Sequence, residues 1–77
     1  MNVRVLNILI MARIQLNGRK LELTNKQTIF ELLKRYKIDS KKIALELNGK
    51  ILNQNKYKII YVKNKDKIEI VHFIGGG

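Results

Sequence analysis

The residues that offer the clearest chemistry are three consecutive glycines, Gly75, Gly76 and Gly77, which follow the longest β-rich run, IEIVHFI at 68–74. The reactive group there is the terminal carboxylate. Glycine has no Cβ to obstruct a narrow channel and adopts φ values closed to other residues. Three extended residues reach about 10 Å, at roughly 3.3 to 3.6 Å each. We predict that this tail presents its carboxylate to a partner's active site. The alternative is an ordinary frayed terminus.

Val71 and Phe73 are the residues that we expect a partner enzyme to bind. Alternation along a strand separates them from Ile68 and Ile70, which we expect to face a helix. Ordering three glycines costs about 3 to 6 kcal/mol. Burial of a Phe ring of roughly 150 to 250 Å² returns about 4 to 6 kcal/mol. The alternative is that a bulge leaves Phe73 in the core and Ile74 outside.

The sequence contains no other set of residues typical of catalysis or metal binding. It has no Cys, a single His and six dispersed carboxylates, which excludes disulfides, thiolate chemistry and cysteine-ligated zinc. Glu69 and His72 fall on opposite faces of a strand and cannot act as a pair. A chain of 77 residues buries only about 60% of its surface on folding, which leaves little room for a substrate chamber. We predict a protein that is not an enzyme, without catalytic residues, a metal or a bound cofactor.

The charge balance is strongly basic, with 16 Lys and Arg against 6 Asp and Glu and a net charge of +10. Twelve of the sixteen basic residues are lysines scattered along the chain, whereas proteins that recognise particular nucleic-acid bases favour arginine. A solvated surface is therefore the favoured interpretation, with no nucleic acid as partner. The alternative is a β-sheet RNA-binding module that uses Tyr36, Tyr57 and Tyr61, whose affinity would fall steeply with salt. The apolar start at residues 1–11 is shorter than the roughly 20 residues of a membrane span, so we expect no membrane partner. The absence of cysteine fits a reducing, cytoplasmic setting.

The elements that must position the tail begin with a hairpin and a helix. Asn17-Gly18 separates two alternating runs, at residues 13–16 and 21–23, which is the strongest local signal for a hairpin. Thr28 and Glu31 have the spacing of a helix capping box. The apolar stripe that follows comprises Ile29, Leu32, Leu33 and Tyr36, and the helix should end near residue 37.

The second half of the chain predicts a mixed sheet. An alternating strand at 43–47 enters Asn48-Gly49, and a short return strand follows at 51–52. We expect a loop or single helical turn at 53–58, a short strand at 59–62 and the central strand at 68–74. The fold class is then α+β, a β-grasp or ubiquitin-like arrangement of four to five strands packed on one main helix. Residues 1–11 form an extension, either loose or the product of an upstream start codon; residues 12–74 form the domain and 75–77 a flexible tail.

The sequence from about Ala12 to Gly77 resembles the ThiS family of sulfur carriers. The resemblance rests on IQLNG at 14–18, TIFELLKRY at 28–36, LNGKIL at 47–52 and, most specifically, IEIVHFIGGG at 68–77. It implies that a ThiF-type enzyme, using ATP and Mg²⁺, adenylates Gly77. Sulfur from a cysteine desulfurase or similar donor would then give a thiocarboxylate, which thiazole synthase, ThiG, uses to build the thiazole of thiamine. Gly75 and Gly76 would thread into the partners, and Val71 and Phe73 would contact them.

Two departures and two related interpretations accompany this resemblance. Residues 1–11 lie outside it, and Lys65-Asp66 replaces the usual Gly-Asp turn before the last strand. The MoaD carriers of molybdopterin synthesis also end in Gly-Gly, but typically after a proline, which this chain lacks. A peptide-conjugating modifier like ubiquitin would use the same tail. The sulfur donor, the true start at Met1 or Met11 and the oligomeric state are left open by the sequence.

Overall fold

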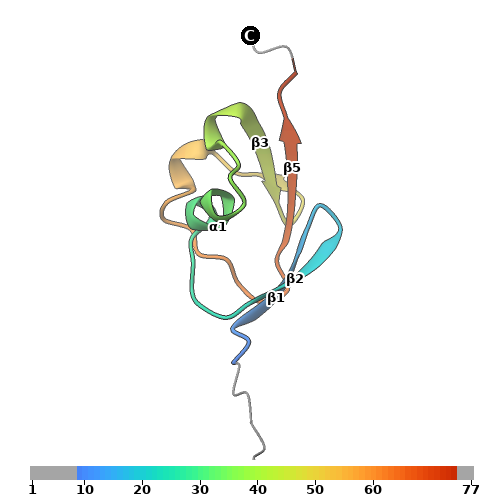
Figure 1. The fold of residues 1–77 in the computed structure, drawn as a ribbon. Helices are drawn as coiled ribbons and strands as arrows, with labels where there is room; N and C mark the ends of the chain where they lie inside the picture. Colours follow the sequence, from blue (N-terminus) through green and yellow to red (C-terminus); the bar gives the residue numbers. More distant parts are fainter. Residues whose placement is uncertain (1–8, 75–77) are drawn as a thin grey trace, which may run out of the picture.

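The computed structural model describes residues 9–74, which form a mixed five-stranded sheet with one α-helix on one side (Figure 1). The sheet order is β2-β1-β5-β3-β4, so the last strand is central, as predicted. β1 and β5 pair in parallel and all other neighbours are antiparallel. The bounds are β1 Ala12–Leu16, β2 Arg19–Leu23, α1 Ile29–Arg35, β3 Ile43–Leu47, β4 Lys50–Ile51 and β5 Lys67–His72, with 3₁₀ turns η1 Ser40–Lys42 and η2 Gln54–Lys56. The predicted β-grasp architecture is confirmed.

Both Asn-Gly hairpins form where the sequence places them. Asn17 and Asn48 have φ values of 49° and 53°, and each following glycine also has a positive φ, which is the geometry of a type I′ turn. The asparagine side chains have a second role that the turn signal does not reveal. Asn17 Oδ1 accepts a hydrogen bond from the Ile70 amide at 2.6 Å, and Asn48 Oδ1 accepts one from the Lys67 amide at 2.8 Å. Each hairpin is thereby fastened to the central strand β5.

The predicted capping box starts α1. Thr28 Oγ1 accepts from the Glu31 amide at 3.1 Å, and Glu31 Oε1 accepts from the Thr28 amide at 2.8 Å. The apolar stripe of the helix is buried against the sheet, except for Tyr36, which is 43% exposed. Its assignment to the core stripe was wrong, because α1 ends at Arg35 and Tyr36 is already its C-cap.

The core lies between α1 and one face of the sheet, and it includes Tyr57 and Val62 from the connection between β4 and β5. Tyr57 is only 2% exposed, and burial raises the pKa of its phenol above the ordinary value of 10.0. The connection contains the predicted helical turn, η2, but the strand expected at 59–62 is wrong. Only one isolated bridge forms there, between Tyr61 and Thr28, because this segment packs beside the helix start and not within the sheet.

The remaining elements differ from prediction at their ends. β4 covers Lys50–Ile51, one residue earlier than expected, and β5 ends at His72 although the β-rich run continues to Ile74. The proposed division into an extension at 1–11, a domain at 12–74 and a tail at 75–77 stays a prediction, since residues 1–8 and 75–77 lie outside the described part of the chain. Within residues 9–74, no helix is long and apolar enough to cross a membrane.

Candidate functional site

The candidate site is the end of β5, where the central strand leads toward the glycines. Phe73 follows directly after the strand, and its amide donates a hydrogen bond of 2.9 Å to the carbonyl of Lys42, the last residue of η1, which directly precedes β3. The backbone is therefore fixed to the sheet up to two residues before Gly75. The predicted threading residues, Gly75 and Gly76, and the predicted attachment residue, Gly77, lie outside the described residues.

Val71 and Phe73 lie on the face of the sheet that points away from α1. They are 65% and 61% exposed, whereas Ile68 and Ile70 on the same strand are buried in the core. This is the arrangement expected from the alternation of a strand. The alternative, in which a bulge buries Phe73 and exposes only Ile74, is excluded, since Phe73 is exposed and Ile74 is 96% exposed as well. A hydrophobic surface therefore borders the segment that leads to Gly75.

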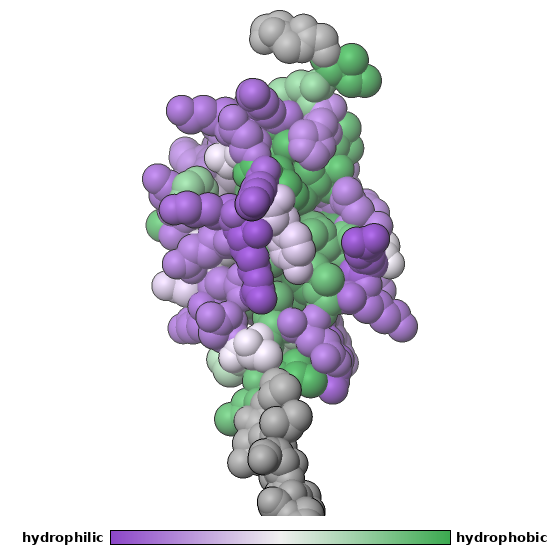
Figure 2. Space-filling model, viewed as in Figure 1, coloured by the Kyte–Doolittle hydropathy of each residue, from purple (hydrophilic) through white to green (hydrophobic). Residues whose placement is uncertain are grey.

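Cross-strand pairing defines what surrounds these two residues. Val71 lies opposite Ala44 on β3, and Glu69 lies opposite Glu46. Val71, Phe73 and Ala44 are called the apolar patch from here on. Figure 2 shows hydrophobic surface reaching the end of the molecule that leads into the glycines, while hydrophilic side chains cover much of the rest of the view.

The two glutamates form the rim of the apolar patch. Like charges directly opposite each other on a sheet are destabilising, and in the described part of the chain neither carboxylate makes an ion pair. The spacing of Glu46 and Glu69 in the sequence does not reveal this pair, because the register between β3 and β5 must be known first. A partner that covers the patch would gain by placing a cation against this rim.

No metal site is assembled among residues 9–74. No three of the His, Cys, Asp and Glu side chains described are placed to hold a metal ion. His72 is exposed and lies opposite the buried Ile43 on the neighbouring strand. The site thus consists of an exposed apolar face beside a central strand whose backbone is hydrogen-bonded to its neighbours as far as Phe73.

Fold and site together define a class: a small β-grasp protein with an apolar sheet face beside a central strand that leads into a glycine tail. The sequence profile of the ThiS family matches residues 11–77. The chain is 37% identical over 65 residues to the sulfur carrier protein ThiS of Bacillus subtilis, with 83% of this chain and 98% of that protein covered. The chain belongs to the ThiS family.

Two further relatives support the assignment. A crystal structure of the thiamine biosynthesis protein ThiS from Geobacter metallireducens superimposes with a TM-score of 0.73 at 28% identity, covering 84% of this chain and 99% of that one. The chain is also 37% identical over 65 residues to a thiazole synthase of Paramagnetospirillum magneticum. That match covers 84% of this chain but spans only a fifth of the length of the thiazole synthase.

Proposed function

We propose that this chain carries sulfur as a thiocarboxylate on Gly77 and donates it for thiazole formation. The chain is a sulfur carrier protein of thiamine biosynthesis, as its family shows. The proposal adds the chemistry and the residues. An oxygen of the Gly77 carboxylate attacks the α-phosphorus of ATP, and pyrophosphate leaves. The terminal sulfur of the donor's persulfide then attacks the acyl carbon and AMP leaves, which gives an acyl disulfide. A thiol reduces this disulfide by forming a new disulfide with the donor's cysteine sulfur, and the thiocarboxylate remains. Adenylation is needed because a free carboxylate is a poor acceptor for a nucleophile.

The partners supply the catalysis in this proposal. A ThiF-type enzyme binds ATP and Mg²⁺ and forms the adenylate, so the carrier itself holds no cofactor. A cysteine desulfurase or similar donor provides the sulfur, and thiazole synthase receives it in the cytoplasm. The thiazole synthase of Paramagnetospirillum magneticum contains a stretch similar to this chain, which supports the last of these partnerships. In this proposal the carrier is a co-substrate of these enzymes and not an enzyme itself.

The observation that carries the proposal is the apolar patch beside the strand that leads to Gly75. Val71 and Phe73 are exposed and lie outside the core, and the hydrogen bond from Phe73 to Lys42 holds the backbone in place. A partner can bury Val71 and Phe73 while Gly75 and Gly76 extend into its active site. Burial of the patch then offsets the entropy lost when the tail is ordered.

Adenylate formation tests the proposal directly. The chain is incubated with its cognate ThiF-type enzyme, labelled pyrophosphate, ATP and Mg²⁺, and exchange of the label into ATP is measured. We expect exchange with the full chain and none when Gly77 is deleted. Because Gly77 follows the folded domain, the deleted variant should keep the same circular dichroism spectrum. Equal exchange with the deleted variant would contradict Gly77 as the attachment residue.

A further inference from the structure

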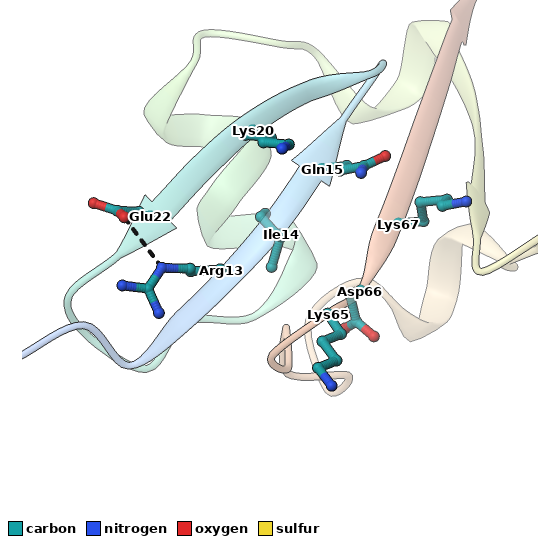
Figure 3. A pocket seen from close by; sticks show the side chains of 8 residues that line it. All are labelled: Arg13, Ile14, Gln15, Lys20, Glu22, Lys65, Asp66 and Lys67. Carbon is teal, nitrogen blue, oxygen red and sulfur yellow. Dashed lines mark hydrogen bonds and ion pairs between the residues drawn. The ribbon is translucent and has the colours of Figure 1, made fainter.

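A basic hollow lies on the outer face of the sheet, at the end of β5 opposite to the apolar patch (Figure 3). Its volume is about 440 Å³, and the side chains that line it include Arg13, Gln15, Lys20, Lys65 and Lys67. It forms because β1 and β5 pair at only two positions. On the N-terminal side of those positions, β1 runs beside the turn at 63–66, and the hollow lies between them.

One row of side chains crosses three strands at the hollow. Gln15 on β1 lies opposite Lys20 on β2 and, on its other side, opposite Lys67 on β5. Figure 3 shows these three side chains on one face of the sheet. With strands roughly 4.8 Å apart, the backbones of the two lysines are separated by roughly 10 Å. This is comparable to the Debye length of about 8 to 10 Å in physiological salt, so the two ammonium groups reinforce each other's field.

The turn before β5 adds a third lysine. Lys65 has a φ of 74°, in the left-handed region that glycine adopts freely and that a lysine adopts only at a cost. Its amide donates to the carbonyl of Arg13 at 2.7 Å, and Asn64 Oδ1 accepts from the Arg13 amide at 2.8 Å. The turn is thereby fixed against β1. These hydrogen bonds hold the backbone of Lys65 at the border of the hollow.

The carboxylates at the hollow are already engaged. Glu22 pairs with Arg13 at 3.2 Å. Asp66 accepts hydrogen bonds from Asn48 Nδ2 at 2.9 Å and from the Lys63 amide at 2.7 Å. Among residues 9–74, Lys20, Lys65 and Lys67 therefore make no ion pair, and the hollow retains an excess of positive charge.

We propose that the basic hollow binds an oligophosphate anion. Lys20, Lys65 and Lys67 contact its phosphate oxygens as point charges, and the Gln15 amide group donates a hydrogen bond between them. All three lysines line this one hollow of about 440 Å³ and do not follow an extended groove, and this local grouping favours a compact oligophosphate over an extended polymer. The site is separate from the chemistry at Gly77 and does not depend on the proposed function.

The test uses inorganic tripolyphosphate and the full chain labelled with ¹⁵N, titrated by NMR at two salt concentrations. We expect the largest amide shifts at Gln15, Lys20, Lys65 and Lys67, and an affinity that falls with salt. A triple variant, K20Q/K65Q/K67Q, should bind at least tenfold more weakly. The matched control, K34Q/K37Q/K56Q, removes the same charge from exposed positions around α1 and η2 and should bind within about twofold of the unaltered chain, as expected when surface charges act locally.

Two further experiments test whether the phosphate groups belong to a nucleic acid and whether the Lys65 side chain takes part in binding. If a short single-stranded RNA displaces tripolyphosphate and needs the same three lysines, the natural ligand of the hollow is a nucleic acid and the proposal fails. If the RNA binds more weakly per phosphate group than tripolyphosphate does, the ligand is a free oligophosphate, as proposed. Lys65→Gly should raise the Tm and yet weaken tripolyphosphate binding. Equal losses in the two triple variants, or amide shifts spread over all the lysines, would overturn the proposal.

Discussion

Replacing Val71 and Phe73 with alanine should sharply weaken use of the carrier by its adenylating partner. Phe73 is 61% exposed, and a Phe side chain has a surface of roughly 200 Å², so about 120 Å² is open to a partner. Full burial of this area contributes about 3 kcal/mol. Val71, at 65% exposure, adds about 1 kcal/mol. A total of about 4 kcal/mol corresponds to a roughly thousandfold loss of kcat/KM for the double variant.

The assay is pyrophosphate release by the cognate ThiF-type enzyme as a function of carrier concentration. Ile59→Ala is the matched control, because Ile59 is 63% exposed but belongs to the segment that packs beside α1. We expect Ile59→Ala to leave kcat/KM within about twofold. Both the double variant and the control should have a free energy of unfolding within about 0.5 kcal/mol of the unaltered chain, as is usual for exposed positions. If the double variant kept kcat/KM within twofold while remaining folded, the docking role of the patch would be refuted.

Three further predictions concern the scaffold. Asn17→Gly keeps the positive φ of the hairpin but removes the side-chain hydrogen bonds to Ile70, and urea unfolding should show a loss of about 1 to 3 kcal/mol. Burial raises the pKa of Tyr57 in the folded state, so the protonated phenol stabilises the fold. This stabilisation is fully present below the pKa of the unfolded chain, near 10, and is lost as the pH rises through the pKa of the folded state. Tyr57→Phe should therefore reduce the loss of stability measured between about pH 9 and pH 11, and an unchanged alkaline loss would contradict this reasoning. Glu46→Lys places a cation opposite Glu69 and should stabilise the fold by about 0.2 to 1 kcal/mol in the same unfolding assay; a lower stability would show that the two carboxylates do not repel each other.

Local signals in the sequence were sufficient for the hairpins, the capped helix and the central strand. Asn-Gly dipeptides and a capping box act within a few residues, so the chemistry that sets them is contained in the motif. The exposure of Val71 and Phe73 also followed from simple alternation, once Ile68 and Ile70 were assigned to the core. These predictions are confirmed by the structure.

The features that the sequence did not predict lie at the end of the helix or depend on distant segments. Tyr36 matches the helical spacing but lies beyond the last helical residue. Tyr57 and Val62 enter the core from an irregular connection, for which periodicity gives no signal. The opposition of Glu46 and Glu69 and the hollow beside Lys65 both depend on strand register and on a turn held by hydrogen bonds to β1. Such features arise only when segments far apart in the sequence are brought together.

The most direct test of the central claim is the intact mass of the chain after incubation with its ThiF-type partner, ATP, Mg²⁺ and a sulfur donor. We predict an AMP adduct without the donor and, with it, the replacement of one oxygen by sulfur. Fragmentation should locate both changes at Gly77. A chain that stays unmodified in the presence of an active partner, or one modified at another residue, would contradict the account.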